Sequence, residues 1–159
     1  MSDVNYFQFN NVLSNKQRKL LIKTCKPLVR KLSPSHPALQ TNAYALFQNK
    51  DISFFYDILG NIIRENLNLN FKFTESWFNE DSGLKKDICW HTHPEPHYTC
   101  VYYAQTIPFF SSGTLFKEKF VRSKQNSLLI FPGSILHGTP SYPFHLIKRY
   151  TLVTDMIFG

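Results

Sequence analysis

Short apolar stretches separated by turn residues fill the chain from Ile88 to its C-terminal end, and they limit what it can fold into. Proline has no backbone N–H to donate and glycine readily adopts turn conformations, so both interrupt regular ladders. Many short strands with such turns between them are typical of a sandwich or a barrel. The sequence therefore predicts an all-β C-terminal part, with strands at 88–93, 98–105, 114–121, 127–131, 135–138 and 146–157.

The N-terminal part carries helical periodicity after one short alternating stretch. Residues 4–9 alternate apolar and polar side chains, as a strand does. Ser14 is suited to cap a following helix, because its hydroxyl accepts a hydrogen bond from a free amide of the first turn. Apolar side chains recur at helical spacing across 15–32, and Pro27 is expected to end or kink this helix. The expected apolar stripe comprises Leu20, Leu21, Cys25, Leu28, Val29 and Leu32.

A second helix and a strand are predicted before the all-β part. Asp51 is expected to cap a helix that runs to about Asn66, and 67–78 alternates as a strand does. The pattern of 38–49 is ambiguous. Helices followed by strands favour the α+β class. Because a chain of 159 residues favours one domain, we expect the first strand and the helices in 1–66 and the β-core in 67–159.

The composition narrows the classes of partner and location. The formal net charge of +7 fits either a solvated basic helix face or an anionic partner, such as nucleic acid or a small carboxylate. No apolar run reaches the ~18 residues of a membrane helix, and the N-terminus lacks the pattern of a secretion signal. Three scattered cysteines without a CxxC pair favour buried free thiols over disulfides. The expected location is the cytoplasm.

Three of the six histidines gather in ICWHTHPEPH, at the expected tip of a hairpin. They are His91, His93 and His97, and Glu95 lies among them. Imidazole and carboxylate groups at this density indicate a divalent metal site. Two ligands two residues apart on a strand point to the same side. The candidate pairs are therefore His91 with His93 and His93 with Glu95, while His97 is assigned to hairpin stability or to substrate contact.

Two further side chains complete an ordered set. His137 lies between two turn-forming stretches, so it is well placed to supply a ligand from another strand. Arg149 follows it by twelve positions inside an apolar strand, where an unpaired charge is costly and an anion is needed. A guanidinium binds a carboxylate through two parallel hydrogen bonds. Thr151, on the same face as Arg149, is expected to donate one more.

Five stretches of this sequence together resemble the 2-oxoglutarate/Fe(II)-dependent oxygenases. The resemblance spans roughly 71–158. Within that family, the sequence looks most like small phage and bacterial oxygenases with an HTHP run, and it also resembles prolyl hydroxylases. The stretches are HTHPEPH at 91–97, CVYYAQ at 100–105, SGTLFKE at 112–118, LLIFPGSILHGTP at 128–140 and RYTLVTD at 149–155. The resemblance implies a double-stranded β-helix, a cupin-like jelly-roll, with N-terminal support helices.

The resemblance also implies a set of site residues and cofactors. His137 would be the distal ligand of Fe(II), and Arg149 with Thr151 would bind the 5-carboxylate of 2-oxoglutarate, which Tyr103 would also touch. O2 would be the second co-substrate, and ascorbate is a candidate reductant. The family's His-x-Asp/Glu pattern is matched only by His93 with Glu95, whereas His91 with His93 would give a three-histidine site.

The implied activity is hydroxylation of a substrate that the sequence does not identify. A proline of a protein, as in prolyl hydroxylases, a free amino acid and a nucleobase all fit as the substrate. The location would be the host cytoplasm if the chain is viral. The alternative from another class is a non-catalytic jelly-roll, a binding or viral structural module. A cupin-like metal enzyme without 2-oxoglutarate is a third reading, and it would not need Arg149.

Overall fold

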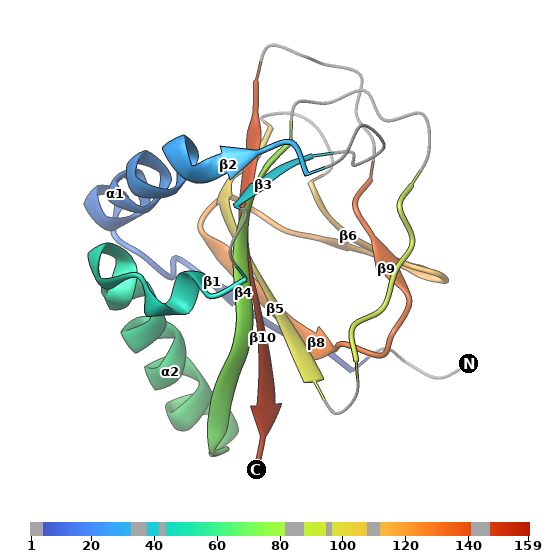
Figure 1. The fold of residues 1–159 in the computed structure, drawn as a ribbon. Coiled ribbons are helices and arrows are strands. Elements are labelled where there is room, and N and C mark those ends of the chain that lie inside the picture. The colour runs from blue at the N-terminus through green and yellow to red at the C-terminus, as the bar shows by residue number, and fades with distance from the viewer. Residues whose placement is uncertain are drawn as a thin grey trace.

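Two antiparallel sheets face each other in the computed structural model, which describes residues 5–32, 38–41, 44–81, 88–94, 97–107, 112–140 and 147–159 (Figure 1). The larger sheet has the order β1-β8-β5-β10-β4-β3-β2 and the smaller has the order β7-β6-β9. The larger sheet contains β1 Phe7–Asn10, β2 Val29–Arg30, β3 Leu39–Thr41, β4 Phe71–Asp81, β5 His97–Gln105, β8 Ser127–Pro132 and β10 Arg149–Phe158. The smaller contains β6 Gly113–Phe116, β7 Lys119–Arg122 and β9 His137–Gly138. The predicted α+β jelly-roll is confirmed.

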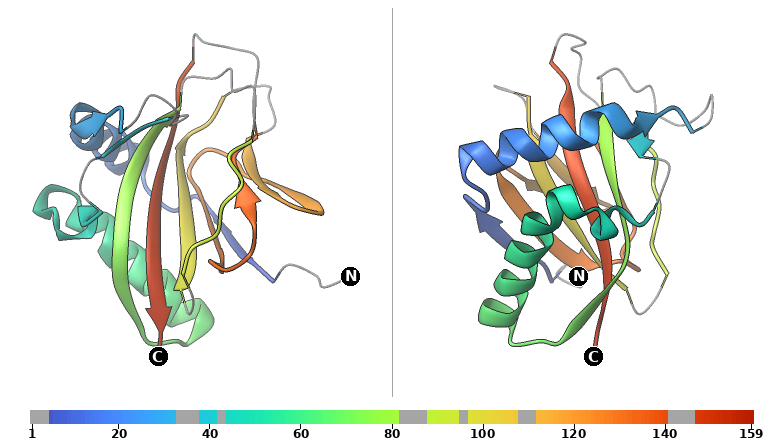
Figure 2. Two further views of the ribbon diagram at one scale, coloured as in Figure 1. Left: turned by 45° about the vertical axis from the view of Figure 1, so that its right-hand side comes forward. Right: turned by 60° about the vertical axis from the view of Figure 1, so that its left-hand side comes forward.

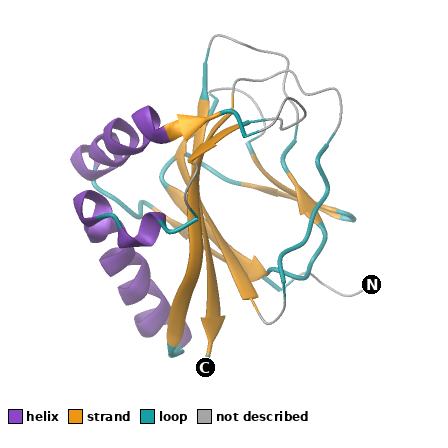
Figure 3. Ribbon diagram, viewed as in Figure 1, coloured by secondary structure: helices purple, strands orange, loops and turns teal. Residues whose placement is uncertain are grey.

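The helices cover the face of the larger sheet that points away from the smaller one (Figures 2 and 3). They are α1 Asn15–Cys25 and α2 Ser53–Leu67, with 3-10 turns η1 Lys26–Leu28, η2 Leu46–Gln48 and η3 Lys50–Ile52. Ser14 caps α1 as predicted: its hydroxyl accepts from the Gln17 backbone N–H, and the Gln17 side chain accepts from the Ser14 N–H. None of the described helices is long and apolar enough to cross a bilayer.

The buried face of α1 differs from the predicted stripe. The chain leaves the α-helix at Cys25 and passes through η1, which contains Pro27, into β2, so the predicted helix to residue 32 is too long. Leu20 is 45% exposed, whereas Arg18 is buried and donates a hydrogen bond to the Ala104 carbonyl. The buried residues of α1 are Arg18, Leu21 and Cys25, at i, i+3 and i+7.

The start of α2 also differs from the prediction. Asp51 does not cap it; the Asn49 side chain accepts a hydrogen bond from the Asp51 N–H and so caps η3, which leads into α2. The helix ends at Asn68, which adopts the left-handed conformation at φ 51°. Its buried face, formed by Phe55, Tyr56, Leu59, Gly60 and Ile63, packs on the larger sheet.

The central strands of the larger sheet serve two cores because their side chains alternate between faces. Tyr102, Leu128 and Leu152 belong to the core under the helices. Tyr103 and Leu129, each one position further along its strand, belong to the smaller core between the sheets, with Phe116, Val121 and Phe131. Both faces of β10 are therefore covered, and its residues from 149 to 156 are buried.

Several predicted strands need correction. Residues 88–93 form no strand, and among them only His91 pairs, through an isolated bridge with His137. The predicted strand 114–121 is the hairpin of β6 and β7, which turns at residues 117 and 118. All three cysteines are free, as predicted, but Cys89 is exposed because it lies in the irregular segment.

Candidate metal centre and co-substrate pocket

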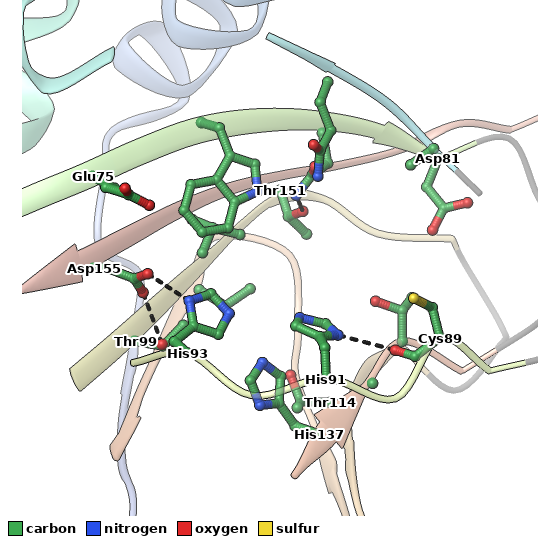
Figure 4. Close-up of a pocket in the computed structure, with 18 of the residues that line it drawn as sticks. Glu75, Asp81, Cys89, His91, His93, Thr99, Thr114, His137, Thr151 and Asp155 are labelled. Carbon is green, nitrogen blue, oxygen red and sulfur yellow. Dashed lines mark hydrogen bonds and ion pairs between the residues drawn. The ribbon is translucent and has the colours of Figure 1, made fainter. Parts of the chain in front are cut away.

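A cavity of about 410 Å³ opens between the sheets, and the inward side chains of β10 and β4 form one of its walls (Figure 4). Antiparallel pairing places these side chains in rows, because every second residue of each strand faces the cavity. The paired residues are Arg149 with Asp81, Thr151 with Asn79, Val153 with Trp77, and Asp155 with Glu75. The wall therefore has the Arg149 guanidinium beside the Asp81 carboxylate at one end and the two carboxylates of Asp155 and Glu75 at the other.

His91 and His137 are brought together by the backbone. Each donates its N–H to the carbonyl of the other, with both N···O distances at 3.0 Å. Such a mutual pair holds two residues directly opposite each other, as in a ladder. The irregular segment 88–94 thus lies beside β9, and the two imidazoles have ring centroids 4.4 Å apart.

His93 is placed by contacts with the turn after β8. Its N–H donates to the Gly133 carbonyl at 2.7 Å, and the Gly133 N–H donates to the His97 carbonyl at 2.8 Å. A Cβ on Gly133 would lie 3.0 Å from the Cβ of His93, so a side chain there would push His93 away. The absence of a side chain at Gly133 lets His93 approach the other two histidines.

The three imidazoles offer one ligand atom each within 4.8 Å of one another, among the described residues (Figure 4). Nδ1 of His91 lies 3.0 Å from the Cys89 carbonyl, and Nδ1 of His137 lies 2.7 Å from the Ile135 carbonyl. A carbonyl only accepts, so both Nδ1 atoms carry the proton and both Nε2 atoms keep a lone pair. Nδ1 of His93 meets the carboxylate of Asp155, so the lone pair of this imidazole also lies on Nε2.

Burial keeps His137 neutral. Its pKa is lowered from the ordinary 6.5 to about 4, chiefly by desolvation and also by the neighbouring His91 and His93, against the hydrogen bond to Ile135 and the charge of Asp155, which raise it. At neutral pH His137 therefore presents an uncharged imidazole, which is the form that binds a metal ion. Three imidazoles whose ligand atoms lie within 4.8 Å of one another fit a divalent transition metal.

Asp155 is a member of this site that the sequence analysis missed. Its Oδ2 lies 2.5 Å from Nδ1 of His93, and its Oδ1 accepts from the Thr99 hydroxyl at 2.8 Å (Figure 4). The ring of Trp77 stacks on His93 with centroids 5.5 Å apart and an interplanar angle of 11°. A sequence signal exists, since Asp155 follows Arg149 by six positions and period-two alternation places both on one face.

Arg149 lies buried at the other end of the wall, with 5% of its surface exposed. Its Nη2 donates to the Thr139 hydroxyl at 3.1 Å and lies 3.7 Å from Oδ2 of Asp81. Nε and Nη1 have no hydrogen-bond partner among the described residues. Because buried donors are normally paired, a cavity-lining guanidinium with two such donors fits an incoming anion.

The remaining predicted residues are distributed as follows. Tyr103 and Thr151 line the same cavity as Arg149. The Tyr103 hydroxyl shares a 2.5 Å hydrogen bond with the Thr114 hydroxyl, and the Thr151 hydroxyl accepts from the Asn79 amide at 3.2 Å. Burial raises the pKa of Tyr103, so it stays a neutral donor. Glu95 lies outside the described residues.

Comparisons with known proteins find similarity at the level of structure. No family model matches the chain, and no curated protein sequence matches it. The epimerase SnoN of nogalamycin biosynthesis, described as non-heme and alpha-ketoglutarate dependent, superposes with a TM-score of 0.75 at 8% identity, over 97% of this chain and 78% of that one. The viral collagen prolyl hydroxylase of Paramecium bursaria Chlorella virus-1, in complex with 2-oxoglutarate, superposes with a TM-score of 0.63 at 15% identity, over 95% and 94%.

The chain has the fold of the 2-oxoglutarate/Fe(II)-dependent oxygenases. HygX from Streptomyces hygroscopicus adds a third example, with a TM-score of 0.68 at 10% identity, over 96% of this chain and 82% of HygX. Its structures hold iron, or nickel with 2-oxoglutarate. At these identities the likeness establishes the fold, so the function has to be argued from the side chains of the pocket.

Proposed function

We propose that this protein is an Fe(II)- and 2-oxoglutarate-dependent oxygenase, with His91, His93 and His137 as the metal ligands. The observation that carries the proposal is the pairing of two features in one cavity. Three imidazoles bring one ligand atom each within 4.8 Å of one another, and Arg149, which lines the same cavity, is a buried guanidinium with two donors that have no hydrogen-bond partner among the described residues. A jelly-roll with only a structural role has no need of either feature.

Arg149 would hold the distal carboxylate of 2-oxoglutarate. A fork of N–H groups matches a carboxylate in geometry, and the low polarity of the partly closed pocket strengthens the pair. Tyr103 and Thr151 lie on neighbouring strands in the next row of the wall, where their hydroxyls would complete the carboxylate site. Thr139, already bonded to Nη2, would fix the direction of the guanidinium.

The histidines would hold the iron, and the iron would supply oxidative chemistry. When bound, it couples O2-dependent decarboxylation of 2-oxoglutarate, to succinate and CO2, with oxidation of a substrate C–H bond. The protein would bind and orient the two co-substrates and limit the access of water to them. Hydroxylation is the outcome we propose. Related structures include both an epimerase and a prolyl hydroxylase, so the substrate, whether a protein, an amino acid or a nucleobase, has to be found by experiment.

The test is the release of succinate from 2-oxoglutarate. Purified protein with Fe(II), O2 and ascorbate should convert 2-oxoglutarate to succinate slowly without substrate, and a chelator should stop the conversion. His137→Ala should be inactive under the same conditions. Binding of Fe(II) without any binding of 2-oxoglutarate would favour a metal enzyme of another type, and binding of neither would favour a non-catalytic module.

A further inference from the structure

The three histidines differ in what holds them. His91 and His137 donate from Nδ1 to uncharged backbone carbonyls, those of Cys89 and Ile135. His93 meets a carboxylate, that of Asp155, and the 2.5 Å separation of Nδ1 from Oδ2 is shorter than the usual range of a charge-assisted hydrogen bond. The side chains of His93 and Asp155 are only 8% and 3% exposed, so solvent screens their interaction weakly.

The contact between His93 and Asp155 would affect the balance of charge around a bound metal ion. Three neutral imidazoles leave the two positive charges of Fe(II) uncompensated by any ligand from the protein. A carboxylate buried this deeply is costly unless it is paired with a cation or well bonded. Its partners here, the Thr99 hydroxyl and the His93 imidazole, are both neutral when His93 is a metal ligand. A dication on the far nitrogen of His93 would offset the buried charge.

We propose that Asp155 is the carboxylate of this metal centre, acting through the His93 ring rather than by direct ligation. This inference rests on the proposed function, because it needs metal at the three histidines. Asp155 is a positioning residue: it fixes the Nδ1–H tautomer and the ring orientation of His93 and makes Nε2 a stronger donor. The negative charge that a His-x-Asp/Glu pair would bring to the metal is thus supplied from β10, one imidazole away.

The surroundings of Asp155 are built to hold it in this place. Thr99 of β5 is its cross-strand neighbour and donates to the second carboxylate oxygen, so both oxygens have a partner. Trp77 of β4 stacks on the opposite partner, the His93 ring, and restricts its rotation. Residues of three adjacent strands, β5, β10 and β4, therefore position the hydrogen bond between Asp155 and His93. His93 itself lies in the segment 88–94, which has no regular secondary structure.

The decisive variant is Asp155→Asn, which keeps the shape and removes the charge. The amide oxygen still accepts from His93, and the amide nitrogen can donate to Thr99. Anaerobic titration calorimetry with Fe(II) or Mn(II) should show a metal affinity 10- to 100-fold below wild type, the order of loss when an outer partner of a metal-bound histidine is removed. Thr99→Val, which keeps the charge but loosens the carboxylate, should show a smaller loss in the same direction.

Glu80→Gln is the matched control. Glu80 lies on β4, is 5% exposed and pairs with Lys148, but it does not line the cavity. Its replacement by glutamine also removes a buried carboxylate from the larger sheet, so a loss of stability from that cause should occur in this variant as well. The metal affinity of Glu80→Gln should equal that of wild type.

The Fe(III)/Fe(II) potential provides a readout that a merely structural role would not move. A nearby negative charge stabilises Fe(III) more than Fe(II), so the potential of Asp155→Asn should lie above that of wild type and of Glu80→Gln. Unchanged affinity, or lowered affinity with an unchanged potential, would overturn the role of Asp155 and leave the metal site intact. Failure of the wild type to bind metal would instead overturn the proposed function, and this inference with it.

Discussion

Each histidine of the candidate centre has its Nδ1 engaged before any metal arrives, and this is the strongest residue-scale support for ligation through Nε2. The sequence was sufficient to single out His91, His93 and His137, because histidines seldom occur by chance in this arrangement together with an arginine such as Arg149. It was not sufficient to choose between His91 and Glu95 as the third ligand. That choice depends on the bridge between His91 and His137, which joins segments 46 residues apart.

Removal of His137 should abolish high-affinity metal binding. In His137→Ala, a third of the proposed ligands is lost, and we expect a loss of affinity above the ~10- to 100-fold typical of an outer partner. Anaerobic calorimetry with Mn(II) would measure it. Undiminished affinity would rule out the three-histidine site.

The choice of third ligand leads to a paired prediction. His91→Ala should lose metal affinity to about the same extent as His137→Ala, whereas Glu95→Ala should bind metal like wild type. The same titration decides between them. The reverse pattern would show that His93 and Glu95 form the ligand pair and that His91 is structural.

The elements that build the site are only partly regular. The apolar stretches were enough to predict β4, β5, β8 and β10, and β8 and β10 bury nearly all of their side chains because both of their faces are covered. The same signal wrongly predicted a strand at 88–93, because an apolar run beside a histidine motif looks the same whether it pairs along its length or at His91 alone. The sequence of a short apolar run does not show whether the run pairs with another strand along its whole length.

The turn after β8 should be sensitive to any added side chain. In Gly133→Ala the new Cβ would lie 3.0 Å from the Cβ of His93 and 3.1 Å from the His97 carbonyl oxygen, so the histidine segment must shift. We expect metal affinity to fall about 10-fold, since displacements near 0.5 Å already matter in such sites. Gly60→Ala, on α2, is the control, and it should leave metal affinity unchanged. Equal affinity in the two variants would contradict the role given to Gly133.

Asn126 joins the N-terminal segment to the larger sheet and should matter for stability alone. Its amide oxygen accepts from the Leu13 N–H and the Tyr102 hydroxyl, its nitrogen donates to the Leu13 carbonyl, and its backbone adopts φ 65°. Asn126→Ala should lower the free energy of unfolding by about 2–4 kcal/mol, through lost hydrogen bonds and a strained backbone. Urea unfolding would measure this.

Asn126→Gly separates the two contributions, because glycine adopts a positive φ freely. It should be about 1 kcal/mol more stable than Asn126→Ala. Equal stabilities would mean that the left-handed backbone contributes nothing. Metal affinity should be that of wild type in both variants.

At the scale of the whole molecule, the fold was predictable and the assembly of the site was not. Short strands broken by turns indicated a sandwich or a barrel, and the resemblance to the oxygenases implied a jelly-roll with support helices, as the structure has it. The end of α1 agrees with the expectation that Pro27 ends or kinks the helix, whereas the start of α2 was misplaced because the 3-10 turn η3 precedes it. The contact between Asp155 and His93 spans 62 residues, and only the closing of the two sheets brings it about.

The two ends of the cavity can be tested separately, because each is proposed to bind a different partner. The histidine end should control metal, and the Arg149 end should control the co-substrate. Arg149→Lys should restore only part of the affinity for 2-oxoglutarate that Arg149→Ala loses, because an ammonium lacks the planar fork.

The most direct test of the central claim is calorimetric titration of 2-oxoglutarate into the Mn(II)-loaded wild type and into Mn(II)-loaded Arg149→Ala, without O2. The two proteins should bind Mn(II) alike. The wild type should bind 2-oxoglutarate more tightly by about 2–5 kcal/mol, the cost of truncating one partner of a buried charge-assisted pair. Equal affinities for 2-oxoglutarate would show that Arg149 is structural and would contradict the oxygenase assignment.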